Sequence, residues 1–198
     1  MKQILVDVDD VLLEWTQGFK LWFEHKHDRK LEGKPDHYNL RRWTGMNDEQ
    51  VDRELTEFNE NSWEFGCLPP VPGAKAGVSK LVDLYGYRLV AITSCSTNPQ
   101  TVALRKANLY HVFGDVFDAV HCVSLGESKA THLADYKPTF WIEDNVSNAK
   151  MGTEYGHTPI VRTTPQNKRY RDGNPMIWCD HWNEIIEEII EFDYMENA

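Results

Sequence analysis

The stretch ILVDVDDVLLEW, residues 4–15, decides the fold because an apolar run ends abruptly in acid. Ile4 to Val6 predicts a short buried strand, and Asp7, Asp9 and Asp10 follow it with no basic residue beside them. Carboxylates this close raise one another's pKa unless a cation or a reaction makes use of them. Alone, the stretch is also typical of a strand followed by a solvated acidic turn. The rest of the chain has to supply the cation or the reaction.

The composition predicts a globular protein with one large core and room for a small subdomain. The chain has 198 residues, of which 41% are hydrophobic. A formal net charge of −10 disfavours a nucleic-acid or anionic membrane surface as the main partner. We therefore expect neither a stable nucleic-acid complex nor a membrane association, and any phosphate ligand must be attracted by local groups.

Cysteine usage and the first residues indicate the compartment. No two cysteines form a CxxC pair, which favours reduced thiols over a disulfide or zinc framework. The first apolar run is too short for a signal peptide or a membrane span. These features predict a cytoplasmic protein, and the oligomeric state stays open. The four cysteines are Cys67, Cys95, Cys122 and Cys179.

Short apolar runs alternate with helical patterns along most of the chain. Continuous runs of this kind suit strands that are covered on both faces, and alternation with helices predicts a doubly wound parallel α/β sheet. Such sheets bind ligands at the carboxyl ends of their strands. The runs are 4–6, 89–92, 119–123, 140–142 and 160–161, and the helical patterns include 78–85, a segment from Asn98-Pro99, and 182–190.

Residues 14–72 interrupt this alternation. A second helix in this segment is predicted to start at Asn47, with Gln50 as its capping-box partner. The segment ends in LPPVPGA, residues 68–74, whose prolines disfavour helix. We predict a small helical cap over 14–72, inserted after the first strand, and an α/β core formed by 1–13 and 73–198.

Three further features could complete a site with the first acidic turn. The strand LVAITSCS ends in the hydroxyls of Thr93 and Ser94, Lys129 lies near the start of a short helix, and FWIEDN ends on Glu143 and Asp144. Each has an ordinary explanation when taken singly, as a turn or a surface charge. Their order along the chain is more specific. It puts acid, hydroxyl, lysine and acidic pair at one edge of one sheet.

That order resembles the haloacid dehalogenase (HAD)-like phosphatase superfamily, with a discontinuous match from Ile4 to about Ala149. The resemblance implies that Asp7 is a nucleophile and Asp9 a general acid and base. Thr93 and Ser94 would bind phosphate together with Lys129. The protein would be a Mg²⁺-dependent phosphomonoesterase that forms an aspartyl phosphate.

The same resemblance implies a Mg²⁺ site made by Asp7, the backbone carbonyl of Asp9, and Asp144. Two positions depart from the family pattern. Asp10 stands where the family usually has glycine, and Asp is among the few residues that tolerate a positive φ there. The acidic pair is Glu-Asp, so Glu143 is predicted to orient the ligands rather than to bind the metal.

The position of the insert resembles the 5'(3')-deoxyribonucleotidase branch of this superfamily, which implies a small phosphorylated substrate, most simply a deoxynucleoside monophosphate. Aromatic faces of the cap could stack on a base, and the candidates are Trp15, Phe19, Trp63 and Phe65. The basic run NKRYR, residues 167–171, is predicted to be a solvated loop.

Four alternatives stay open at this point. Two are enzymes of the same fold, a sugar-phosphate phosphatase and a nucleic-acid 3'-end phosphatase, of which the net charge disfavours the second. A phospho-receiver domain would not need so long an insert after its first strand. A non-catalytic binding domain would not need the full set of reactive side chains.

Overall fold

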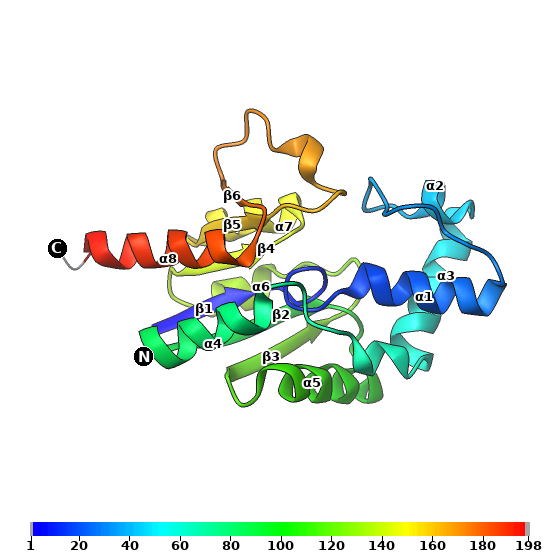
Figure 1. Ribbon diagram of the computed structural model, residues 1–198, viewed down its shortest axis with the longest axis horizontal. Coiled ribbons are helices and arrows are strands. Elements are labelled where there is room, and N and C mark those ends of the chain that lie inside the picture. Colours follow the sequence, from blue (N-terminus) through cyan, green and yellow to red (C-terminus); the bar gives the residue numbers. More distant parts are fainter. Residues whose placement is uncertain (1, 197–198) are drawn as a thin grey trace.

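A six-stranded parallel sheet forms the centre of the molecule, as the computed structural model, which describes residues 2–196, shows (Figure 1). The strand order is β3-β2-β1-β4-β5-β6, so the strand before Asp7 is central. The last strand is three residues long and was not predicted. The strands are β1 (Lys2–Val6), β2 (Tyr87–Ser94), β3 (Phe117–Val123), β4 (Phe140–Glu143), β5 (Thr158–Arg162) and β6 (Ile177–Cys179).

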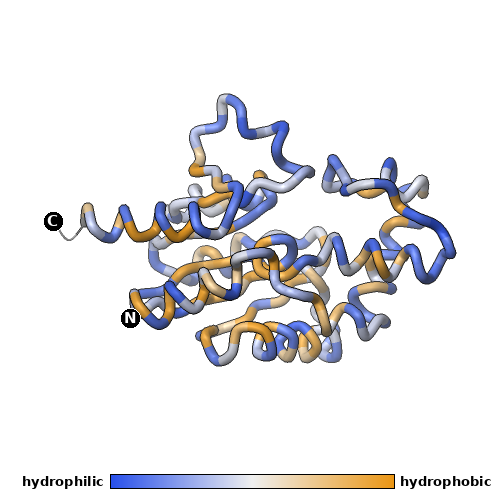
Figure 2. The backbone as a smooth tube through the Cα atoms, in the orientation of Figure 1, coloured by the Kyte–Doolittle hydropathy of each residue, from blue (hydrophilic) through white to orange (hydrophobic). Residues whose placement is uncertain are grey.

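Helices cover both faces of the sheet, which confirms the doubly wound arrangement. Alternation along β1 buries Ile4 and Val6 in one core cluster and Leu5 in another. The larger cluster includes residues of α4 (Ala74–Tyr85), α5 (Pro99–Phe113) and α8 (Trp182–Glu196). The smaller one includes Leu133 of α6 (Ala130–Ala134) and is contacted by Met151 of α7 (Val146–Glu154). Figure 2 shows apolar stretches along the strands and apolar residues alternating with hydrophilic ones along the helices.

Local signals set the ends of these helices. Gly86 follows α4 with a φ of +69°, and its N–H caps the helix at Leu81 and Val82. Asn98 caps α5, because its side chain accepts a hydrogen bond from the backbone N–H of Gln100, and Pro99 follows as the first helical residue. Both helix boundaries were predicted from the sequence.

The parallel register levels the carboxyl ends of the central strands. Val6 lies beside Ala91 of β2 and beside Ile142 of β4. The next residue, Asp7, continues the pairing because its N–H donates to the carbonyl of Ile142 at 2.8 Å. The ends of β1, β2 and β4 therefore meet at one edge.

The segment after β1 lies beyond this carboxyl edge (Figure 1). It contains α1 (Trp15–His27), α2 (Arg41–Thr44), α3 (Asp48–Asn61) and the 3₁₀ helix η1 (Glu64–Cys67). The capping box of α3 is formed as predicted, with reciprocal hydrogen bonds between Asn47 and Gln50 of 3.0 and 2.9 Å. Phe19, Phe58 and Phe65 are fully buried in its aromatic interior. The exact boundaries 14–72 of a separate cap remain a prediction.

Within residues 2–196, no helix combines the length and the apolar character that crossing a bilayer requires.

Candidate functional site

A tight turn after β1 separates the three acidic residues of the opening stretch. Asp10 adopts a φ of +56°, the conformation anticipated for a position that favours glycine. Its carboxylate accepts hydrogen bonds from the backbone N–H of Thr16, at 3.0 Å, and from the Thr16 hydroxyl. The carboxylate of Asp10 thus satisfies the first turn of α1, whereas Asp7 and Asp9 are available for chemistry.

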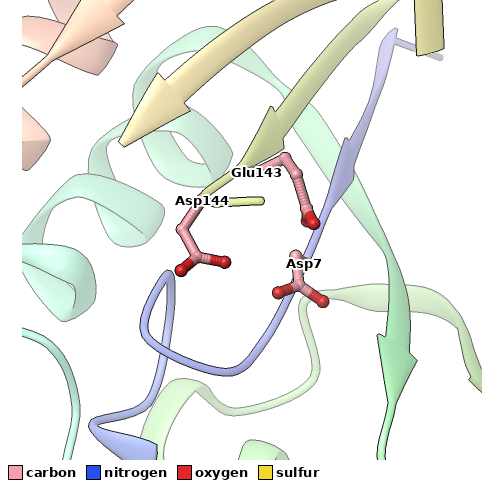
Figure 3. Close-up of side chains that lie close together, drawn as sticks. All are labelled: Asp7, Glu143 and Asp144. Carbon is pink, nitrogen blue, oxygen red and sulfur yellow. The ribbon is translucent and has the colours of Figure 1, made fainter. Parts of the chain in front are cut away.

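Asp7 joins a buried cluster of acids at the carboxyl edge. Carboxylate oxygens of Asp7, Glu143 and Asp144 all lie within 4.8 Å of one another, and Figure 3 shows the three groups converging from β1 and the end of β4. Exposure is 5% or less for Asp7 and Glu143 and 9% for Asp144. So much buried negative charge requires compensation.

Lys129 supplies part of that compensation from the start of α6. Its Nζ donates to Oδ1 of Asp7 at 2.6 Å and to Oε2 of Glu143 at 3.3 Å, and the side chain is almost fully buried. Burial lowers the pKa of Lys129, but the charges of Asp7 and Glu143 outweigh it and the net shift is upward. Lys129 is therefore a fixed cation at neutral pH.

One lysine does not neutralise three acids. Burial, followed by the charge of Asp7, raises the pKa of Glu143 to about 8. Burial and the charge of Glu143 raise the pKa of Asp144 well above its usual value. Burial thus disfavours the charged form of both carboxyl groups, and a second cation in the cluster would favour it.

The donor atoms of the cluster fit a hard divalent cation such as Mg²⁺. All are carboxylate oxygens, which Mg²⁺ prefers. Both oxygens of Glu143 are engaged, one by Lys129 and the other by the Asn148 side chain at 2.7 Å. Among the described residues, none is recorded donating a hydrogen bond to the carboxylate of Asp144, while its backbone carbonyl accepts from Tyr38 at 2.6 Å and Asn167 at 2.7 Å. Asp7 and Asp144 are accordingly better placed as ligands than Glu143.

Asp9 lies beside this cluster and forms an ion pair of its own. Nη2 of Arg105, on α5, donates to Oδ1 of Asp9 at 2.6 Å, and the Asp9 side chain keeps 20% of its surface exposed. Burial raises the pKa of Asp9 to about 8, and the opposing charge of Arg105 limits the rise. Sequence reasoning missed Arg105, since nothing in a helical segment indicates a partner 96 residues away.

These groups open into a pocket of about 200 Å³. Asp7, Asp9, Lys129 and Asp144 lie on its polar side. The rest of its lining comes from the segment after β1, the end of β2, the start of α7 and the loop after β5, and it includes Trp15, Thr16, Tyr38, Leu40, Leu55, Ser94, Asn145, Asn148 and Gln166. Of these residues, Trp15 and Ser94 were proposed as site residues from the sequence.

The two hydroxyls at the end of β2 are placed differently. Ser94 lines the pocket. Thr93 does not, because neighbouring residues of a strand point to opposite faces; it is fully buried, and its Oγ1 has no hydrogen-bond partner in the described part of the chain. The pocket lining therefore includes Ser94 and not Thr93.

The predicted aromatic platform needs correction. Phe65 and Phe19 are fully buried in the interior of the insert, so neither offers a face to a ligand. Trp63 is 71% exposed but lies outside the pocket lining. Trp15 does line the pocket, and its ring stacks on Phe19 with centroids 5.2 Å apart. Phe19 thus supports Trp15 from behind.

The basic run 167–171 is only partly a solvated loop. Lys168 to Arg171 are exposed, as predicted. Asn167 is fully buried, and its side chain donates to the carbonyls of Asp144 and Arg162, both at 2.7 Å. It ties the loop to the backbone of the acidic cluster.

Comparison with known proteins identifies the fold. The sequence matches no family model and no curated protein. The structure is similar to a haloacid dehalogenase-like family hydrolase from Streptococcus pneumoniae (13% identity, 95% of this chain and 98% of that one, TM-score 0.62). It is also similar to a D,D-heptose 1,7-bisphosphate phosphatase from B. bronchiseptica complexed with magnesium and phosphate (12% identity, 96% of this chain and 99% of that one, TM-score 0.58). A third similar structure is an L-2-haloacid dehalogenase (16% identity, 95% of this chain and 99% of that one, TM-score 0.56). The chain therefore has the fold of the HAD-superfamily hydrolases.

Proposed function

We propose that this protein is a Mg²⁺-dependent phosphomonoesterase that acts through an aspartyl phosphate on Asp7. The observation that supports this best is the 2.6 Å contact between Asp7 and the buried Lys129, inside an acidic cluster that opens into a pocket. A carboxylate nucleophile beside a fixed cation suits attack on an anionic phosphoryl group.

Each side chain then has a defined task. Asp7 attacks phosphorus, while Lys129 and the Ser94 hydroxyl hold phosphoryl oxygens. Asp9 donates a proton to the departing oxygen and later removes one from the water that hydrolyses the aspartyl phosphate, which regenerates both groups. Held by Asp7, the backbone carbonyl of Asp9, and Asp144, a Mg²⁺ ion would offset the negative charge of the nucleophile and the phosphoryl group.

A dehalogenase is the competing hydrolase, because structural neighbours include enzymes of that activity. Two features of this chain favour the phosphatase. A departing halide needs no proton, whereas an alkoxide does, and Asp9 is positioned at the pocket to supply one. Carbon–halogen cleavage also gives no role to an acidic cluster whose donor atoms fit a divalent cation.

We propose a nucleoside monophosphate, with deoxyribose preferred, as the substrate class. Trp15, Leu40 and Leu55 give the pocket one apolar wall against which a base could pack. The small volume and the net charge of −10 disfavour a nucleic-acid 3' end. A sugar phosphate remains the main alternative substrate. The proposed setting is the cytoplasm.

A substrate panel with Mg²⁺ tests both levels of the proposal. Phosphate release is measured from deoxyribonucleoside and ribonucleoside monophosphates, hexose phosphates and a 3'-phosphorylated oligonucleotide, and halide release from 2-haloacids. We expect the deoxynucleotides to have the highest kcat/KM. A higher kcat/KM on hexose phosphates than on nucleotides would refute the nucleotidase activity but not the phosphatase activity. Halide release without phosphate release would refute both activities.

A further inference from the structure

Arg105 is an unusual component of this protein's interior. It lies on α5, is 0% exposed, and has a single recorded hydrogen bond, from Nη2 to Oδ1 of Asp9. Its Nε and Nη1 atoms are buried and reach no partner within residues 2–196. The face of the guanidinium lies against Phe65 of η1, with 4.1 Å between Cζ and the ring centroid.

Such an arrangement is a poor way to stabilise a fold. A buried guanidinium with unsatisfied donors bears a desolvation penalty that one ion pair does not repay, and apolar side chains of similar size often serve stability as well or better. The residue is therefore better explained by what it does to Asp9.

Arg105 constrains the carboxylate of Asp9 in two ways. The bond to Oδ1 restricts the rotation of the group, whose other oxygen, Oδ2, accepts no hydrogen bond from the described residues, and the Asp9 side chain lines the pocket. The ring of Phe65 lies against the face of the guanidinium, which links the segment after β1 to the same carboxylate. Proton transfer depends steeply on such placement.

We infer that Arg105 is a positioning residue for Asp9, which it orients for proton transfer to the leaving oxygen and from water. This inference rests on the proposed phosphomonoesterase function. Arg105 acts through Asp9 and contributes no bond to the phosphoryl group.

The test measures how kcat/KM depends on the leaving group. This parameter reports the steps from substrate binding to departure of the alcohol and does not include hydrolysis of the aspartyl phosphate. The substrates are p-nitrophenyl, phenyl and alkyl phosphates, assayed with Mg²⁺. The variants are Arg105→Met, Arg105→Lys and Asp9→Asn, and the double variant Asp9→Asn/Arg105→Met. Arg88→Met is the matched control, since Arg88 forms an ion pair with Asp118 at 2.9 Å, outside the pocket lining.

We expect Arg105→Met to be folded and to lose about 100-fold in kcat/KM on alkyl phosphates but less than about 5-fold on p-nitrophenyl phosphate, whose leaving group needs little protonation. Arg105→Lys keeps the positive charge but lacks the planar guanidinium, so its kcat/KM on alkyl phosphates should lie between those of the wild type and Arg105→Met. Adding Arg105→Met to Asp9→Asn should change nothing further, because the effect passes through Asp9. Arg88→Met should match the wild type.

Each other outcome decides against the inference. An equal loss on all substrates, no loss, or a full additional loss in the double variant would refute the positioning role while leaving the phosphatase intact. Should Arg105→Met fail to fold, Arg105→Lys provides the same comparison. A wild-type protein that hydrolyses none of the esters would refute the proposed function, and with it the role of Arg105.

Discussion

Nζ of Lys129 lies 2.6 Å from Oδ1 of Asp7, although 122 positions separate the two residues in the chain. The contact joins the start of a five-residue helix to the end of the central strand. It is the only lysine or arginine contact within 4.0 Å recorded for the Asp7 carboxylate in the described residues. We expect both the stability and the chemistry of the site to depend on this contact.

Replacing Lys129 should therefore damage the fold as well as the activity. In Lys129→Met, two buried carboxylates lose their cation, and we expect the free energy of unfolding without Mg²⁺ to fall by about 3–5 kcal/mol. Phosphatase kcat/KM should fall at least ~100-fold. Urea denaturation and phosphate release measure the two effects. The control Lys26→Met breaks a partly exposed pair with Glu54 and should cost at most about 1 kcal/mol; an equal cost in both variants would contradict the prediction.

Asp7→Asn should remain folded and lose at least ~1,000-fold in turnover, because an amide is not a competent nucleophile. In the wild type, rapid quenching with borohydride during turnover should convert the aspartyl phosphate to homoserine at position 7, which peptide mass spectrometry detects. Asp180→Asn, at an exposed site, should leave activity and labelling unchanged. Labelling at another residue would exclude Asp7 as the nucleophile.

Without divalent metal, the protein should become less stable as the pH rises from about 5 to about 8. Folding raises the pKa of Asp9 and of Glu143 to about 8, and that of Asp144 rises too. Between the unfolded pKa values near 4 and these folded values, the folded state binds more protons, so stability falls with increasing pH. Thermal unfolding in chelator measures the slope, and Mg²⁺ should flatten it. A melting temperature that rises across this range in chelator would contradict the prediction.

Trp15 should determine substrate preference. Trp15→Leu removes the stacking face from the pocket, and we expect the preference for nucleoside monophosphates over a simple alkyl phosphate to fall by roughly 5- to 100-fold. Trp63→Leu is the control, because that side chain is exposed and outside the lining. If Trp15→Leu slows every substrate equally, Trp15 contributes to the structure of the pocket and not to recognition of the base.

Asp10 combines a backbone and a side-chain requirement, which substitutions can separate. Asp10→Gly tolerates the φ of +56° but loses the hydrogen bonds to Thr16, so it should cost about 1 kcal/mol of stability. Asp10→Ala loses the same bonds and adds backbone strain of roughly 1 kcal/mol. Urea denaturation should rank wild type above Asp10→Gly and Asp10→Ala last; equal stability of the two variants would exclude the strain.

The amino-acid sequence was enough to predict the architecture, because the strand and helix signals lie within short stretches of the chain. Apolar runs predicted five of the six strands, and Asn47, Gly86 and Asn98 marked helix ends through bonds made within a few residues. Since parallel strands share one edge for their carboxyl ends, the sequence also predicted that Asp7, Lys129 and Asp144 lie together, as they do in the structure. The exception, β6, is too short to carry a pattern.

Only the tertiary structure decided which candidates face the pocket. Thr93 and Ser94 are equivalent in sequence, but strand alternation puts Ser94 at the pocket and buries Thr93. Among the aromatics of the insert, packing between distant segments buried Phe65 and left Trp15 at the wall. Arg105 forms an ion pair with Asp9, which lies 96 residues away in the chain. Burial and ion pairing depend on which segments come together in space, and neither periodicity nor spacing along one chain specifies that.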